Sequence, residues 1–285
     1  GEQAAAMRAL EGFTRSVAKE IGKKSATAQS IYVEEGAEAN IDSAFRFVIS
    51  AKSAYMDGQI ANNAIAYMKE LAQEDEPFFL AVGFKRPHLP FAAPKKYWDL
   101  YKRADIVLEP FQEQSTNPVS VAYHNAGEIR AYTDIPADIA ATKQKGFGLA
   151  LSTEKQKELI HGYYAAISYT DALVGQLLNT IDSLGLASNT IIVLWGDHGW
   201  HLGDHNIWCK HSNFEQATHA PLIISSPGIA PNKTKSLSEH VDIFPTLCDL
   251  AGVKIPEVLD GKSLKPIMNK SSKSVKEYSI SQYPR

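Results

Sequence analysis

The most informative segment of the chain reads Ile191-Ile192-Val193-Leu194-Trp195-Gly196-Asp197-His198-Gly199-Trp200, an apolar run followed at once by polar residues. The apolar half predicts a buried strand, and Gly196 predicts a turn after it. Ligands of open α/β sheets bind beyond the carboxyl ends of strands, so Asp197 and His198 are expected to face a shared pocket. An isolated Asp-His pair is more often a turn with a surface histidine. Here further histidines follow closely, which favours a metal or anion site.

Helical patterns alternate with short apolar runs along the chain. Helices are predicted at residues 4–21, 57–73, 154–184 and 241–250, and strands at 78–83, 190–195 and 221–225. Asp57 is expected to be the N-cap of the helix at 57–73. A capping box of Thr153 and Gln156 is expected at the start of the helix at 154–184, and Gly185 is expected to end it. The alternation indicates an α/β fold, and residues 104–150 are expected to form a long irregular excursion.

Composition excludes several classes of partner. The chain has 29 basic and 32 acidic residues and a net charge of -3, so no bulk charge drives it onto nucleic acid or acidic lipid. No apolar run approaches the roughly 20 residues of a membrane-spanning helix. Cys209 and Cys248 could pair, but two cysteines give no disulfide framework.

Two further loops carry basic residues. Lys210 stands in Trp208-Cys209-Lys210-His211-Ser212-Asn213, where its flanking residues favour a lysine held in a pocket over a solvated surface charge. There it could stabilise negative charge on a transferring oxyanion group. The segment Lys85-Arg86-Pro87-His88-Leu89-Pro90 follows a predicted strand, and its prolines would fix the backbone around His88. A rigid exposed loop explains that segment equally well. Together the loops suggest hydrolysis of an anionic ester.

These motifs resemble the sulfatase family of the alkaline-phosphatase-like superfamily, and most closely the subfamily of iduronate-2-sulfatase and its bacterial relatives. The resemblance runs from about residue 57 to the end, through residues 78–91, 197–203, 208–214, 217–223, 242–252 and 281–285. It implies a mixed, mostly parallel sheet flanked by helices. It also implies that residues 1–253 form the later part of a catalytic domain and 254–285 the beginning of a smaller α+β subdomain.

The resemblance implies a chemistry as well. Sulfatases hydrolyse sulfate esters on sugars with a formylglycine made from Cys or Ser, and they hold a divalent cation, usually Ca²⁺. By position, Asp197 and His198 resemble metal-site residues, although Ca²⁺ prefers oxygen ligands and His198 could instead contact the sulfate or the nucleophile. The other implied roles are catalysis for Lys210 and His88, and substrate binding for Trp200, His211 and Lys85.

The sequence departs from the family in one respect. The family's nucleophile sits in Cys/Ser-x-Pro-x-Arg, and neither Cys209, Cys248 nor Ser281 has that context. The resemblance therefore implies that the nucleophile and the early metal ligands lie in a segment before Gly1, either on the same polypeptide or on a separate chain of the same enzyme. Two alternatives stay open, namely a phosphate or phosphonate monoester hydrolase and a non-catalytic binder of sulfated glycans. The resemblance implies a periplasmic, secreted or lysosomal location.

Overall fold

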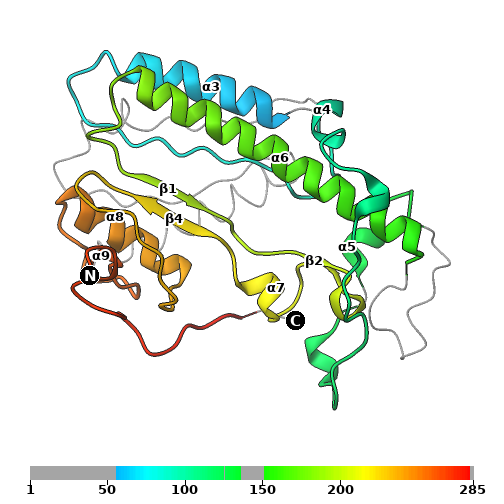
Figure 1. Ribbon diagram of the computed structural model, residues 1–285. Coiled ribbons are helices and arrows are strands. Elements are labelled where there is room, and N and C mark those ends of the chain that lie inside the picture. Colours follow the sequence, from blue (N-terminus) through cyan, green and yellow to red (C-terminus); the bar gives the residue numbers. More distant parts are fainter. Residues whose placement is uncertain (1–55, 125, 136–150, 283–285) are drawn as a thin grey trace, which may run out of the picture. The chain divides into compact units, whose positions relative to one another are not determined.

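The computed structural model describes residues 56–124, 126–135 and 151–282 (Figure 1). Two compact units emerge, one of residues 1–105 and 160–186 and the other of residues 106–159 and 187–285. The helix predicted at residues 4–21 lies outside the described ranges. Among the helices that the structure describes, none is both long and apolar enough to cross a membrane.

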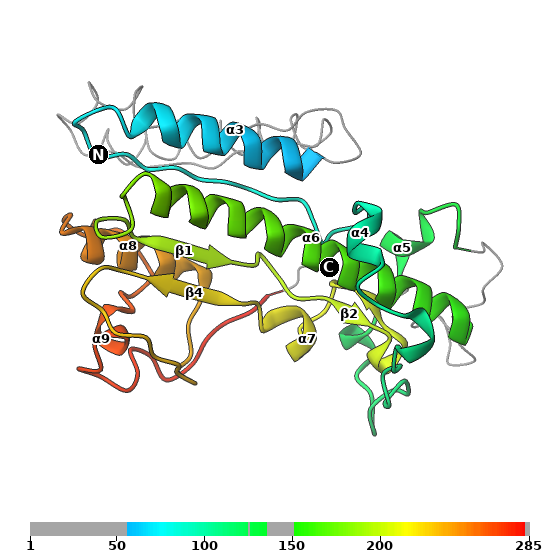
Figure 2. The same ribbon diagram turned by 45° about the horizontal axis from the view of Figure 1, so that its top comes forward.

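The first unit is built on two long helices, α3 (Met56–Leu71) and most of α6 (Thr153–Ser183), which lie side by side in Figures 1 and 2. Both helices were predicted and are confirmed. Small residues let the two approach closely, because a Cβ atom on Gly58 would lie 2.6 Å from the Tyr169 hydroxyl oxygen. The short helices α4 (Lys95–Trp98) and η2 (Arg103–Asp105) complete this unit. Its core contains Ala61, Ala93, Tyr97, Ala165, Tyr169 and Leu173.

The ends of these helices differ in part from the predictions. Asp57 is not an N-cap, because it lies inside the first turn of α3, buried. The predicted capping box of α6 is also wrong, since the hydroxyl of Ser152 instead accepts the Lys155 N–H at 3.3 Å. Gly185 is confirmed as the stop, with φ of +72° and its N–H donated to the Asp182 carbonyl at 3.0 Å. Glycine reaches this left-handed conformation without steric cost.

The strand predicted at residues 78–83 is wrong. Only Phe79 forms an isolated bridge, and its side chain is 45% exposed. A single bridge supplies too few interstrand hydrogen bonds to define a strand. The segment is therefore extended connecting chain that leads from α3 to the proline-rich loop.

The second unit contains the two confirmed strands, β1 (Ile192–Trp195) and β4 (Leu222–Ser225). They pair antiparallel, with Ile192 opposite Ser225 and Trp195 opposite Leu222. The other ladder in the described part joins β2 (His201–Leu202) to β3 (Trp208–Cys209) and is also antiparallel. The mostly parallel sheet is thus not confirmed. The predicted burial of β1 is wrong as well, since no third strand extends its ladder within the described residues and Trp195 is 41% exposed.

The remaining helices of the second unit are short. The helix predicted at 241–250 is confirmed as α8 (Ile243–Ala251), with Pro245 in its first turn and Gly252 at its end. The described part of residues 104–150 is irregular, as expected, and holds only single helical turns. The short helices are η3 (Ser120–Ala122), α5 (Gly127–Arg130), η4 (Asp204–Asn206), α7 (Glu215–Thr218), η5 (His240–Asp242) and α9 (Lys265–Met268).

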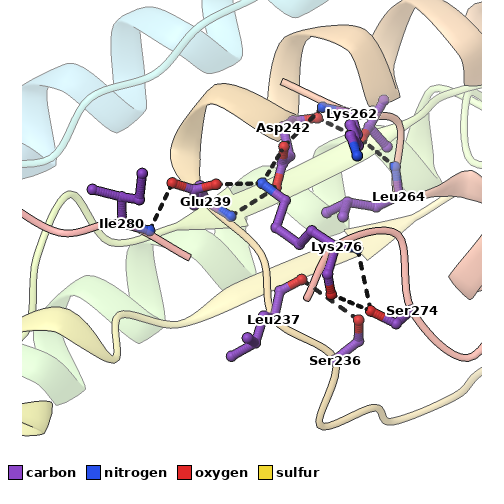
Figure 3. Close-up of polar contacts among 10 residues, drawn as sticks. Ser236, Leu237, Glu239, Asp242, Lys262, Leu264, Ser274, Lys276 and Ile280 are labelled. Atoms are coloured by element: carbon purple, nitrogen blue, oxygen red, sulfur yellow. Dashed lines mark hydrogen bonds and ion pairs between the residues drawn. The ribbon is translucent and has the colours of Figure 1, made fainter. Parts of the chain in front are cut away.

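A buried carboxylate ties the end of the chain to the start of α8 (Figure 3). Asp242 is 0% exposed and accepts the backbone N–H groups of Glu239 and Lys262, each at 2.8 Å. The Lys276 ammonium lies 2.7 Å from the same carboxylate and also bonds to Glu239. Residues on both sides of position 253 thus share one polar network within this unit. The division into domains at that position stays a prediction.

Candidate functional site

The loop after β1 is held by backbone contacts. The Gly196 N–H donates to the Pro221 carbonyl at 3.0 Å, and the Gly199 N–H donates to the Ala217 carbonyl at 2.7 Å. Between these two anchors the chain presents Asp197 and His198 at the carboxyl end of β1, as predicted. The loop is therefore a fixed platform for these two side chains.

The predicted metal pair lies together but is open to solvent. His198 donates Nδ1–H to the Gly199 carbonyl at 2.7 Å, and its Nε2 lies 3.5 Å from Oδ2 of Asp197. The Asp197 side chain is 86% exposed. Ca²⁺ takes six to eight oxygen ligands, and the structure describes no group of three or more His, Cys, Asp or Glu residues arranged to hold a metal. These two residues do not make a calcium site by themselves.

Trp200 links the loop after β1 to Lys210. The Lys210 Nζ lies 5.3 Å from the centroid of the indole ring, within the range of a cation–π contact. The imidazole of His198 stacks near-parallel to the same indole, with ring centroids 6.2 Å apart. The structure thus brings together an indole, an ammonium and an imidazole that the sequence assigned to one site.

Lys210 and His211 lie in a tight turn that is fixed on both sides. Cys209, before them, is 0% exposed and has φ of +75°, a left-handed conformation that costs energy for a residue with a Cβ. Ser212, after them, is buried, and its N–H donates to the Lys210 carbonyl at 2.6 Å. Lys210 is held rather than solvated, since its side chain is only 18% exposed, and its place in a substrate pocket stays a prediction.

A carboxylate from α5 faces this turn. The Lys210 Nζ donates to Oε1 of Glu128 at 2.8 Å, and Nδ1 of His211 lies 3.7 Å from Oε2. The Glu128 carboxylate also acts electrostatically on the buried Cys209 thiol. Burial and the nearby Glu128 charge raise the pKa of this thiol, so Cys209 stays protonated and is unsuited to act as a nucleophile.

A second buried hydrogen-bond network holds the end of the same turn, at Ser212. His201 is 0% exposed, with Nδ1 lying 2.6 Å from Oδ2 of Asp204 and Nε2 lying 2.7 Å from the Ser212 hydroxyl. The order Asp-His-Ser matches a serine hydrolase triad. The buried ring leaves no access for a substrate, and the Ser212 hydroxyl accepts the Phe214 N–H at 3.2 Å. This Asp204–His201–Ser212 relay is therefore structural.

The cluster of histidines in the sequence does not form one site. His201 is locked in the relay, and His205 stacks on Phe214 with ring centroids 4.9 Å apart while donating Nδ1–H to the Glu113 carbonyl at 3.0 Å. Two of these histidines thus serve the fold of the loop. Histidine density alone therefore does not define a site, because it does not say which rings are buried, and the metal or anion site stays a prediction.

The predicted proline-rich loop lies in the first unit and is rigid. The Asp57 carboxylate accepts the backbone N–H groups of Lys85 and Arg86, each at 2.9 Å. The Arg86 guanidinium donates in turn to the carbonyls of Ala92 and His88. His88 donates Nδ1–H to the Leu89 carbonyl at 2.9 Å, which fixes its ring. Lys85 and His88 thus belong to a well-built loop of the first unit, whereas the other predicted site residues lie in the second.

Sequence reasoning missed Glu128. It lies in the stretch of residues 104–150 that has little periodicity and no motif, and a lone glutamate there reads as a surface charge. Only the contact between α5 and β3 brings it to Lys210. No signal in the sequence pointed to this residue.

Comparison with known proteins assigns the chain to a family. The Sulfatase family model matches residues 6–253. The chain belongs to the sulfatase family. It is 35% identical over 226 residues to iduronate 2-sulfatase of Homo sapiens, covering 70% of this chain and 40% of that protein. It is 32% identical over 221 residues to choline-sulfatase of Rhizobium meliloti, covering 75% of this chain and 40% of that protein. The chain thus spans about 40% of the length of these sulfatases.

Solved structures agree on an alkaline-phosphatase-like α/β fold. A phosphonate monoester hydrolase from Silicibacter pomeroyi matches with a TM-score of 0.58 and 27% identity, over 77% of this chain and 42% of that chain. A structure solved with D-glucosamine-2-N,6-O-disulfate as its substrate matches with a TM-score of 0.67 and 20% identity, over 84% of this chain and 58% of that chain. The second likeness concerns the fold alone.

Proposed function

We propose that the full-length protein is a sulfuric ester hydrolase that acts on sulfated sugars, in the manner of an iduronate-2-sulfatase. The observation that supports this most is the turn at Lys210. A mostly buried ammonium lies against the Trp200 indole, and the family resemblance implies that a lysine at this position contacts sulfate. Family membership and the 35% identity to iduronate 2-sulfatase support the same reaction.

In this proposal the residues of the chain bind and neutralise the sulfate. The fixed positive charge of Lys210 would stabilise the negative charge that builds up on the sulfate oxygens. Trp200 and His211 would contact the sugar. For the first unit, the resemblance separately implies substrate binding by Lys85 and protonation of the leaving sugar oxygen by His88. Its ring is already oriented by the bond from Nδ1 to the Leu89 carbonyl, so Nε2 is the atom that would transfer a proton.

Two groups from outside the described residues belong to this proposal. A formylglycine would supply the nucleophile, and a divalent cation would polarise the sulfate. Asp197 is the residue of this chain best suited to bind that cation, because its carboxylate is exposed and offers oxygen donors. Further ligands would have to join it.

Lys210→Ala in the full-length protein tests the proposal. A chromogenic ester of a sulfated uronate is the substrate, and Lys233→Ala, at an exposed loop position, is the matched control. Loss of one preorganised charge-stabilising group costs about 100-fold or more in kcat. We expect a loss of this size for Lys210→Ala and none for Lys233→Ala. Activity of Lys210→Ala near wild type would remove Lys210 from the mechanism.

A second candidate is a phosphonate or phosphate monoester hydrolase. The structural likeness to the phosphonate monoester hydrolase, at 27% identity, favours it. Rates on paired 4-nitrophenyl sulfate, phosphate and phenylphosphonate esters decide between the two. We expect the sulfate ester to be hydrolysed fastest. A faster phosphonate reaction would replace the sulfatase proposal, and no turnover of any ester would favour a binder of sulfated glycans.

A further inference from the structure

Two consecutive residues of one turn, Lys210 and His211, direct polar groups toward a single carboxylate. Lys210 donates to Glu128 at 2.8 Å, and His211 places Nδ1 3.7 Å from its other oxygen. The carboxylate comes from α5, more than 80 residues earlier in the chain, and α5 contacts β3 just before the turn. This convergence makes Glu128 the shared partner of the turn.

The ion pair is largely withdrawn from water. The side chains of Lys210 and Glu128 are 18% and 17% exposed. Charges in such surroundings interact more strongly than a surface pair, because less solvent and salt lies between them. Removal of one partner deprives the other of this ion pair, which is costly for a charge that is largely buried.

We propose that Glu128 is a positioning residue that serves as the internal counter-ion of Lys210. This inference rests on the proposed function of the Lys210 turn. Glu128 fixes the ammonium in one place before the substrate arrives, so Lys210 needs no reorganisation when charge builds up on the sulfate. The same carboxylate repels a free anion that approaches Lys210. Glu128 therefore weakens ground-state binding of sulfate while it supports the transition state, the combination that raises kcat.

A purely structural role predicts something different. If Glu128 only fastened α5 to β3, its loss would lower the amount of folded enzyme. The affinity of the remaining folded molecules for sulfate would not change, and KM would stay at its wild-type value. The counter-ion role instead predicts opposite effects on binding and on turnover. A split between KM and kcat thus separates the two roles.

Glu128→Gln in the full-length protein is the main test, because it removes the charge and keeps the size of the side chain. We expect the Kd for inorganic sulfate, measured by calorimetry, to fall about threefold, as does KM, since the site becomes more positive. We expect kcat to fall about tenfold because Lys210 loses its fixed partner. The control is Glu215→Gln, whose exposed carboxylate pairs with exposed His219 and should leave all three constants unchanged.

Glu128→Asp keeps the inference testable if Glu128→Gln does not fold. Aspartate keeps the charge but is one methylene shorter, so we expect a kcat several-fold below wild type with the sulfate Kd unchanged. Unchanged or weaker sulfate binding in folded Glu128→Gln, or wild-type kcat in Glu128→Asp, would overturn the inference. If wild type hydrolyses no sulfate ester, the proposed function fails. The calorimetric comparison then still decides whether Glu128 opposes anion binding at Lys210.

Discussion

Gly199 lies so close to Gln216 that a Cβ atom on residue 199 would be 2.0 Å from the Gln216 carbonyl oxygen. The neighbouring N–H of Gly199 donates to the Ala217 carbonyl at 2.7 Å, so the loop after β1 rests directly on the backbone of α7. Glycine is required here by this close approach, and not by a left-handed backbone. The position of Asp197 and His198 depends on it.

Gly199→Ala is therefore expected to displace the loop. The new methyl group cannot be accommodated by side-chain movement because the clash is with backbone, so Asp197 and His198 move together. We expect activity on a sulfate ester to fall at least about tenfold with a lower melting temperature. Gly175→Ala is the control, since it lies in α6 with nothing within 4 Å and should be neutral or stabilising by about 0.5–1 kcal/mol. Equal activity of Gly199→Ala and wild type would show that the loop tolerates the shift.

Much of the site could be predicted because its residues follow strands or stand in motifs. Asp197, His198 and Trp200 follow β1 directly, and Lys210 comes directly after the buried residues Trp208 and Cys209, so local sequence pointed to them. Long helices were equally visible, because α3 and α6 carry apolar residues at helical spacing over many turns. Both signals come from residues close together in the chain, and such short-range patterns can be read from a single sequence.

The parts that sequence did not reveal depend on contacts between distant segments. Asp57 looks like a helix cap, but its carboxylate binds the backbone of residues 85 and 86 instead. Glu128 lies in irregular chain and gains its role only from Lys210, 82 residues later. His201 looks like a ligand beside its neighbours, yet it is buried in a relay with Ser212. The local sequence around these three residues does not reveal which distant residue each one contacts in the folded chain.

The Asp204–His201–Ser212 relay is expected to stabilise the turn that carries Lys210. His201→Phe keeps a ring in place but leaves the nearly buried Asp204 carboxylate without its donor, a change that costs about 1–3 kcal/mol of unfolding free energy. Urea unfolding of the full-length protein measures it. His219→Phe serves as control, because that histidine is 82% exposed.

Ser212→Ala tests whether the relay acts as a unit. Alone it removes the hydroxyl that bonds to His201 at 2.7 Å and should cost about 1 kcal/mol. In the His201→Phe background the same change should cost less, because the bond to His201 is already gone and only the one from the Phe214 N–H remains to be lost. Additive costs in the double variant would show that the two groups stabilise the turn independently.

The ion pair of the Lys276 ammonium is expected to contribute more than any other single contact to holding the last described residues against α8. Its side chain is 9% exposed and lies 2.7 Å from the fully buried Asp242 carboxylate. Lys276→Met keeps much of the apolar stem and leaves a buried charge uncompensated, so we expect a loss of about 3 kcal/mol in the free energy of unfolding. Lys273→Met, at an exposed position nearby, should change nothing measurable. A loss below about 0.5 kcal/mol for Lys276→Met would place this pair among ordinary surface ion pairs.

The same network predicts how stability depends on pH. The hydrogen bond from Lys276, followed by the one from the Ile280 N–H, lowers the pKa of Glu239 below its ordinary value of 4.5. A carboxyl with a lowered pKa in the folded protein contributes stability that is present above pH 4.5 and is lost as the pH falls through the folded-state pKa. For Lys276, burial lowers the pKa, but hydrogen bonds to Asp242 and Glu239 outweigh it and raise the pKa overall. Its contribution is therefore complete below pH 10.5 and is lost only as the pH rises further.

Urea midpoints of the full-length protein between pH 3 and 7 check the acid side of this dependence. We expect the urea midpoint of the wild type to decrease once the pH is lowered below about 4.5. The midpoint of Glu239→Gln should be lower at pH 7 and should decrease less on acidification, because glutamine has no charge to lose. Glu257→Gln, which removes an exposed carboxylate, should follow the wild-type curve. If Glu239→Gln kept the full wild-type slope, the acid sensitivity would have to come from other carboxylates. Asp249 would then be the first to replace, because hydrogen bonds from Ser263 and Lys265 also lower its pKa.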